Sequence, residues 1–188
     1  MYKRQALSAA DIVVTEAGFG SDMGAEKFMH IKAATSGKGP DCVVMNVTIR
    51  SMKLHGGAFG SRGGYRPSKA ELEAENVEAV SIGAATNLDR HIRNMAGFGV
   101  PVIVSINKFT SDTEAEIQAL SDAAHASGAR AVTITEVHSK GGEGGEDLAK
   151  AVVKAVQDHV AAGRPFTPLF LKDAPVMEKV EAIATRMY

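Results

Sequence analysis

Short apolar runs alternate with longer amphipathic segments along this chain. The apolar runs are rich in Val, Ile and Thr and lie at residues 11–15, 42–49, 100–106 and 131–135. Each run is nearly continuous rather than alternating, which is typical of strands buried on both faces of a parallel sheet. Pro101 stands near the start of its run, where a missing N–H costs little. The pattern predicts an α/β fold with a mostly parallel sheet flanked by helices.

The segments between these runs carry helix signals. Ser68 and Glu71 have the spacing of a capping box, and so do Ser111 and Glu114. Apolar stripes at helical spacing follow the second box and recur before Gly163, which is expected to end a helix. Further predicted helices cover residues 88–95, 148–160 and 176–187.

The domain boundary is expected at Gly163. Residues 6–163 are interpreted as one α/β domain, and residues 164–188 as a connector and the start of a following region. The first apolar run begins almost at once, and the chain reaches Tyr188 without a helix stop signal. The fold is therefore expected to be incomplete at both ends. Residues 56–64 are rich in glycine and predict a flexible loop.

Composition narrows the functional classes. With 188 residues, of which 45% are hydrophobic and 23% charged, the chain can bury the core of one globular domain. A net charge of -1 gives no overall field that favours nucleic acid or an anionic membrane. The apolar runs are strand-sized, so no membrane-spanning segment is expected. The single cysteine, Cys42, is interpreted as a core residue without a disulfide partner, which favours a cytoplasmic location.

Four loops follow the predicted strands, at residues 16–22, 50–57, 107–113 and 136–145. The carboxyl ends of parallel strands share one edge of the sheet, and open α/β proteins bind ligands there. Each loop has more polar or glycine residues than a plain turn requires. We therefore expect the four loops to form one ligand site.

The first loop offers two carboxylates, Glu16 and Asp22, just past a predicted buried strand. Such carboxylates could hold a metal ion or orient a water molecule. The alternative is that Ser21 or Asp22 caps the following helix, and the sequence leaves both interpretations open.

Glycines surround an aromatic residue in the same loop. Gly18, Gly20 and Gly24 permit close approach of the backbone to a ligand. Phe19 lies between two of them, and such a turn is expected to aim its ring outward rather than into the core.

The second loop brings two cations close together, Arg50 and Lys53. They could bind phosphate or carboxylate oxygens, and the alternative is a solvated basic turn. His55 has no second histidine or cysteine at metal-ligand spacing, so no metal site is predicted there.

The third loop begins with Asn107 and Lys108 and resembles the Asn-Lys-x-Asp element that reads the base in GTP-binding proteins. The aspartate, Asp112, comes two positions too late for that element, which disfavours a guanine reader. Phe109 stands at a strand exit among polar neighbours, including Thr110, and this arrangement suits stacking on a planar ring.

The fourth loop includes Gly141 and Gly142 and leads into a predicted helix N-terminus, which favours anionic groups. The phosphate-binding pattern Gly-x-x-x-x-Gly-Lys-[Ser/Thr] does not occur in the 188 residues. A nucleotide site that uses these loops would take its phosphate loop from elsewhere.

Together these loops resemble the formate–tetrahydrofolate ligase family, also called formyltetrahydrofolate synthetase. The motifs that carry the resemblance are VTEAGFG at 14–20, GAEKF at 24–28, KLHGG at 53–57, FGVPV at 98–102, DTE at 112–114 and KGGEGG at 140–145. They occur in order and cover most of the chain from about residue 6 to its end.

The resemblance implies a P-loop-NTPase-like α/β fold and ATP-dependent ligation of formate to tetrahydrofolate. In the family, ATP phosphorylates formate to formyl phosphate, whose carbonyl the folate amine then attacks. The resemblance further implies Mg²⁺, stimulation by a monovalent cation, and a homotetramer. Family members are considerably longer, so it implies an internal fragment that is inactive by itself.

The resemblance also assigns site residues. It places the pteridine ring between positions that match Phe109 and His138. The family has tryptophan where this chain has His138, and proline where it has Thr110. Imidazole offers less stacking area than indole, so folate affinity is expected to be weaker by about 1 kcal/mol. The insertion-like residues 58–66 have no assigned role.

The remaining roles are expectations from loop position. Glu16 or Asp22 would organise magnesium or water, and Arg50 and Lys53 would stabilise transferring oxygens or the folate tail. The backbones of the loop glycines would line the cleft together with Phe19 and Asn107; these glycines are Gly18, Gly20, Gly141 and Gly142. The alternatives are another nucleotide-dependent protein of the P-loop class, or a non-catalytic module that kept the fold without the chemistry.

Overall fold

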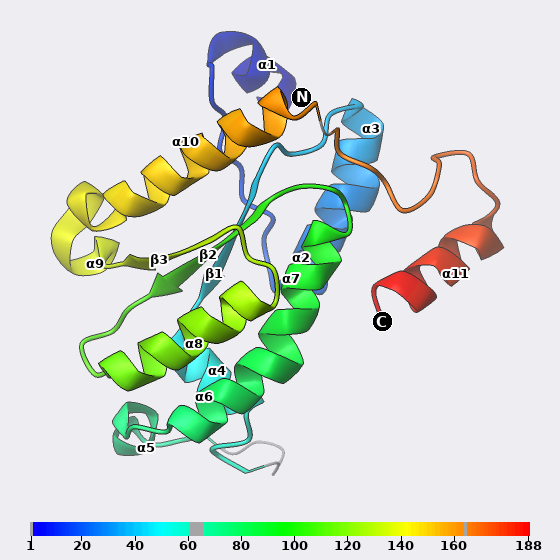
Figure 1. The fold of residues 1–188 in the computed structure, drawn as a ribbon. Helices are drawn as coiled ribbons and strands as arrows, with labels where there is room; N and C mark the ends of the chain where they lie inside the picture. The colour runs from blue at the N-terminus through cyan, green and yellow to red at the C-terminus, as the bar shows by residue number, and fades with distance from the viewer. Residues whose placement is uncertain (1, 61–65, 164) are drawn as a thin grey trace.

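The centre of the protein is a parallel sheet. The computed structural model describes residues 2–60, 66–163 and 165–188. Its three strands are β1 (Val43–Val47), β2 (Val102–Asn107) and β3 (Ala131–Thr135), in the order β1-β2-β3 with both pairs parallel (Figure 1). The predicted α/β class with a parallel sheet is confirmed.

Helices pack on both sides of this sheet (Figure 1). On one side α10 (Glu146–Ala161) contacts β2 and β3. On the other, α7 (Asp89–Ala96) contacts β2 and α8 (Glu114–Ala126) contacts β3. A long helical stretch leads into α7, because α6 (Val77–Gly83) continues through the π-helical turn η2 (Ala84–Leu88).

The shorter elements surround this framework. They are α1 (Tyr2–Ala9), α2 (Gly24–Lys27), η1 (Phe28–Ala33), α3 (Ala34–Ser36), α4 (Ile49–His55), α5 (Lys69–Glu73), α9 (Val137–Lys140), η3 (Gly141–Gly145) and α11 (Val176–Arg186). The helix α11 agrees with the last predicted helix. The predicted flexible loop (residues 56–64) and the insertion-like residues 58–66 both include positions in the range 61–65, which lies outside the described residues. No helix of the described ranges is long and apolar enough to cross a membrane.

The predicted strand at residues 11–15 was wrong. The segment has no strand pairing, and the side chains of Ile12 and Val14 are 56% and 89% exposed. A strand requires a neighbour that satisfies its N–H and C=O groups. An apolar run signals the capacity to pair but does not specify a partner, and none of the three strands takes this segment as a neighbour.

Burial on both faces holds only for the central strand. The first five residues of β2 are buried. By contrast, Val44 in β1 and Ile134 in β3 are each 44% exposed. These strands flank β2, so each is covered less completely than the strand between them.

One predicted capping box is confirmed and the other is displaced. Ser68 Oγ accepts from Glu71 N at 3.3 Å, and the Glu71 carboxylate accepts from Ser68 N at 2.9 Å. The second box is formed by Thr113 and Glu116, two residues later than predicted. The reason is a tight turn before it, in which Asp112 N donates to the carbonyl of residue 109 at 3.1 Å. Helix α8 therefore begins only after that turn.

Two glycines let α4 lie directly against α6. A Cβ atom at Gly56 would overlap the carbonyl of Ala79, and a Cβ at Gly83 would overlap the carbonyl of Met52. The close approach fixes the position of α4, the helix that follows β1, relative to the rest of the core.

Candidate functional site at the carboxyl edge of the sheet

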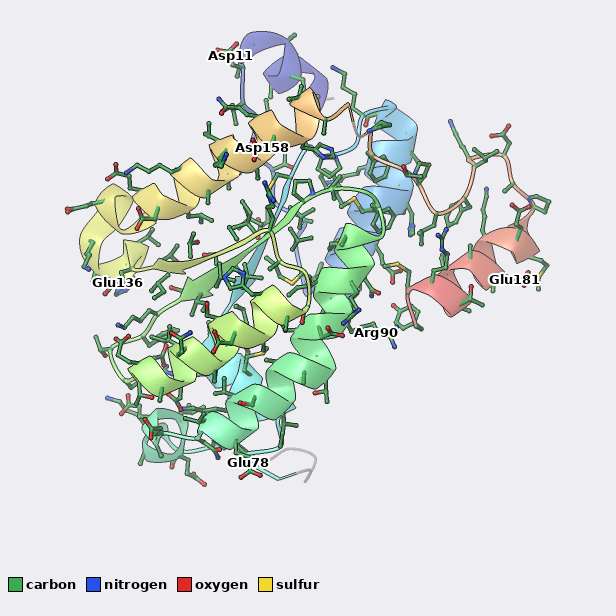
Figure 2. The ribbon with its side chains drawn as sticks, in the orientation of Figure 1. Asp11, Glu78, Arg90, Glu136, Asp158 and Glu181 are labelled. Atoms are coloured by element: carbon green, nitrogen blue, oxygen red, sulfur yellow. The ribbon has the colours of Figure 1, made fainter. Side chains whose placement is uncertain are left out.

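Three of the four predicted loops meet at the carboxyl edge of the sheet. Helix α4 follows β1, residues 108–113 follow β2, and α9 with η3 follows β3. The last two loops are tied together because Lys108 N donates to Thr135 O at 3.0 Å. Figure 2 shows Glu136 at the end of β3, where α9 begins.

Arg50 covers one side of the Phe109 ring. Its guanidinium carbon lies 4.1 Å from the ring centroid, within the range of a cation–π contact. Arg50 Nη2 also donates to Ser111 Oγ at 3.4 Å and lies 3.7 Å from Glu73 Oε1. The Phe109 side chain is still 36% exposed. An aromatic surface is therefore available to a planar ligand at this edge, with a cation behind it.

Lys53 faces the protein interior instead of solvent. It is only 1% exposed, and its ammonium lies 2.7 Å from Glu116 Oε1. It also donates to the carbonyls of Ala74 at 2.8 Å and Leu72 at 3.3 Å. These partners use all three of its N–H donors. The contacts favour an internal role over the expected binding of substrate oxygens.

Glu116 is the other half of this buried pair and is fully buried. Besides Lys53, its carboxylate accepts from Asn76 N at 2.7 Å and from Thr113 N at 3.2 Å. Burial by itself would raise the pKa of Glu116, but the hydrogen bonds from Lys53 and the two backbone N–H groups hold that pKa below its ordinary value. Glu116 is therefore a buried carboxylate in its charged form.

Asp112 is a third buried charged residue near Lys53 and Glu116. It is buried, and one carboxylate oxygen accepts from Phe109 N at 2.8 Å. Burial raises the pKa of Asp112, an effect that the hydrogen bond from Phe109 and the charges of Lys53 and Arg50 oppose. Its other oxygen, like Arg50 Nε, is buried without a hydrogen-bond partner among the described residues. Sequence reasoning considered Asp112 only as a base-reading residue and disfavoured that role, and it missed Glu116. The signal for Glu116 was its spacing of three residues from Thr113, which forms the observed capping box.

The fourth loop presents His138 on the surface. His138 is exposed in α9, on the strand exit next to that of Phe109. The loop is closed by Glu136 N, which donates to Gly144 O at 3.0 Å, and by an ion pair of 2.6 Å between Lys140 and Glu136. The hydrogen bond from Lys140 lowers the pKa of Glu136. Gly141 adopts a φ of 60°, a conformation that favours glycine.

Hydrogen bonds connect the first loop to α7 and to Tyr188. Ser21 Oγ and His91 Nδ1 of α7 lie 2.7 Å apart, and Tyr188 Oη donates to Asp22 O at 3.4 Å. Because the expected strand before it is absent, no strand delivers Glu16 and Asp22 to the carboxyl edge. Both carboxylates are exposed.

Two local expectations for this loop have clear outcomes. Phe19 is 79% exposed with a φ of 73°, so its ring points outward as predicted. The alternative role of Ser21 or Asp22 as a helix cap was wrong, because Met23 occupies the N-cap of α2 and no side chain caps it. Backbone bonds close the turn instead, with Met23 N and Gly24 N both donating to Gly20 O.

The fold and the site define a class: an α/β protein with a parallel sheet whose strand exits carry an aromatic platform suited to a planar ligand. Comparison with known proteins gives the family. A sequence model described as formate–tetrahydrofolate ligase matches residues 1–188, and the chain belongs to that family.

Individual relatives agree with this assignment. The chain is 49% identical to formate–tetrahydrofolate ligase of Dinoroseobacter shibae over 183 residues, which cover 97% of this chain and 30% of that protein. It is 45% identical to the ligase of Paracoccus denitrificans, covering 100% of this chain and 31% of the relative. For the ligase of Staphylococcus carnosus the identity is 47%, with 95% and 30% covered. The chain thus spans less than a third of the length of these curated relatives.

Proposed function

We propose that this chain supplies the folate-binding part of an ATP-dependent ligase that joins formate to tetrahydrofolate and yields 10-formyltetrahydrofolate. The observation that carries the proposal is the Phe109 ring, exposed at the carboxyl edge of the sheet and backed by Arg50 at 4.1 Å. Membership in the ligase family supports the choice of tetrahydrofolate as the planar ligand.

In this proposal the pteridine ring stacks on the exposed surface of Phe109. The Arg50 guanidinium, on the opposite side of the Phe109 ring, fixes the orientation of that ring and adds positive charge near the ligand. His138, exposed at the neighbouring strand exit, contacts the other face of the pteridine. Asn107 and Thr110 are proposed to border the platform, and the backbone of Gly141 and Gly142 to lie beside the bound ring.

The reaction itself is proposed from the family. ATP converts formate to formyl phosphate, and the folate amine attacks its carbonyl carbon and displaces phosphate. For this chain we propose that Arg50 orients the folate or stabilises oxygens near it. Glu16 and Asp22, with Gly18, Gly20 and Phe19 between them, form a second, exposed segment that would face the nucleotide.

Metal ions are not assigned to residues of this chain. Mg²⁺ and a monovalent cation are expected for the family reaction. Within the described residues, however, no group of three or more His, Cys, Asp or Glu side chains could hold a metal ion. The 188 residues also contain no phosphate-binding loop. We therefore propose that ATP and Mg²⁺ are held mainly by other parts of the ligase and that this chain alone is inactive. From the family we further propose that the complete enzyme is a cytoplasmic homo-oligomer.

The test has two parts. The full-length gene product, given formate, ATP and tetrahydrofolate, is expected to form 10-formyltetrahydrofolate, measured by liquid chromatography. The 188-residue chain is expected to bind tetrahydrofolate in a calorimetric titration without hydrolysing ATP. F109A should weaken that binding about threefold to tenfold, the range that loss of one aromatic stack gives. L171A, which truncates a side chain 72% exposed, serves as the control.

The competing candidate is a non-catalytic module that kept the fold. The missing phosphate loop and His138 in place of tryptophan favour it. A full-length gene product that forms no 10-formyltetrahydrofolate, and that also lacks a phosphate loop, would establish this alternative. Folate binding that is the same in F109A and in the unmodified chain would exclude the stacking site.

A further inference from the structure

A buried ion pair lies next to the end of the loop that carries the proposed folate platform. Lys53 and Glu116 are 1% and 0% exposed, and their charged atoms are 2.7 Å apart. Burying two charges is costly, and a hydrophobic pair of similar volume often gives equal or greater stability. Stability alone is therefore a weak reason for this pair, and its contacts indicate another.

The carboxylate of Glu116 fixes the end of the loop that carries Phe109. It accepts from Thr113 N at 3.2 Å, while Thr113 Oγ1 accepts from Glu116 N at 3.3 Å. Thr113 directly follows Asp112, whose carboxylate accepts from Phe109 N at 2.8 Å. Two hydrogen bonds, joined by the peptide link between Asp112 and Thr113, thus connect the buried carboxylate to the backbone of the stacking residue.

The ammonium of Lys53 connects this loop with the end of α5 and the residues that follow it. Through its bonds to the carbonyls of Leu72 and Ala74, it holds the connection between α5 and α6. Glu116 binds the same connection, because it accepts from Asn76 N at 2.7 Å. Figure 2 shows Glu78 in the first turn of α6, which begins just after this connection.

Helix α4 contacts both the Phe109 loop and the first turn of α8, the helix that follows this loop. Lys53 reaches Glu116 below the loop, and Arg50, one turn earlier on the same helix, covers the Phe109 ring at 4.1 Å. Side chains three residues apart lie on one face of a helix. A shift of α4 relative to α8 would therefore change the position of the backbone that carries the guanidinium relative to the ring.

We propose that the Lys53–Glu116 pair is a positioning device that fixes Phe109 and its Arg50 backing in the geometry that accepts the folate ring. Neither residue touches the ligand. The pair acts through Thr113 and Asp112 on one side and through α4 on the other. This inference rests on the proposed function only for the identity of the ligand.

The first experiment reports on the loop without any folate. The chain contains no tryptophan, so F109W introduces a single fluorescent reporter at the platform. Adding K53M and E116Q together removes both charges and avoids an unpaired buried ion. This double change is expected to raise acrylamide quenching of the reporter about twofold and to lower its anisotropy. K150M is the control, because Lys150 is 67% exposed and forms an ion pair with Glu146. It should leave the quenching and the anisotropy unchanged.

The second experiment uses the full-length gene product with its native Phe109. K53M/E116Q is expected to raise the KM for tetrahydrofolate about threefold to tenfold. The KM values for ATP and formate should stay within about twofold, since a loss confined to uniform binding of one substrate moves that KM alone. A merely structural role would lower all activities together in proportion to the folded fraction.

Each outcome decides one question. Unchanged quenching, or an unchanged KM for tetrahydrofolate in a folded double variant, overturns the positioning role. A full-length product that forms no 10-formyltetrahydrofolate overturns the proposed function instead, and the reporter experiment still measures the positioning of residue 109.

Discussion

Removing Lys53 alone should destabilise the protein far more than its single charge suggests. In K53M the Glu116 carboxylate stays fully buried, and the nearest cation, at 2.7 Å, is lost. Breaking a buried pair by removing one partner costs about 3–5 kcal/mol. A domain of this kind has only about 5–15 kcal/mol of stability, so the variant should lose a large fraction of its free energy of unfolding at neutral pH.

The second change should reverse much of this loss. In K53M/E116Q no ion is buried, and the amide oxygen of the introduced glutamine can still accept from one backbone N–H. We expect at least about half of the lost stability to return, because the penalty comes mainly from the uncompensated charge. Urea unfolding followed by circular dichroism gives the free energies of both variants. The exposed pair Lys150–Glu146 is the matched control, and K150M should cost less than about 1 kcal/mol.

The loss in K53M should also depend on pH. In the unmodified protein the pKa of Glu116 is held below its ordinary value of 4.5, so its stabilising contribution is present above that pH and is lost as pH falls. Without Lys53, burial is opposed only by the hydrogen bonds from Asn76 N and Thr113 N, so the pKa of Glu116 should be higher than in the unmodified protein, and protonation then removes the penalty. The gap in unfolding free energy between K53M and the unmodified protein should therefore narrow from pH 7 toward pH 4. A gap that is constant with pH, or a double variant no more stable than K53M, would refute this reasoning.

Three further predictions concern separate parts of the molecule. G56A should lower the free energy of unfolding by about 1–3 kcal/mol, because its Cβ would overlap the Ala79 carbonyl. G18A has open space around the new Cβ and should change the free energy from urea unfolding by less than about 0.5 kcal/mol. Equal losses in the two variants would contradict the close packing. H138W in the full-length product should tighten tetrahydrofolate binding in a calorimetric titration, and unchanged or weaker binding would mean that the ring stacks elsewhere. Burial raises the pKa of the Cys42 thiol to about 11, so iodoacetamide should alkylate it roughly a hundredfold more slowly in the folded chain than in urea; similar rates would argue against that burial.

Most of the framework could be predicted from the sequence. Continuous β-branched runs identified the three strands that pair, and serine–glutamate spacing placed the start of α5 at Ser68. These signals are local, because strand propensity and helix capping depend on residues within a few positions of each other. Residues 11–15 carry the same kind of signal, and there the prediction was wrong, because pairing depends on a neighbour that the segment itself does not encode.

In the site, too, the sequence predicted some features and only the structure showed others. The sequence indicated Phe109 as a stacking residue and Arg50 as a nearby cation, and the structure places them in contact. It gave no indication that Lys53 would turn inward, because a lysine in a predicted loop is expected to be solvated unless its partner is known. That partner, Glu116, lies in α8 beyond a separate strand.

The sequence alone thus determined the α/β class, the strand exits and the aromatic residue at the edge. Only the tertiary structure decided which charges face solvent and which are buried. The physical reason is that desolvating a charge is tolerated only when an opposite charge and hydrogen bonds meet it in space, and residues 53 and 116 meet only after β1, β2 and the helices around them have packed.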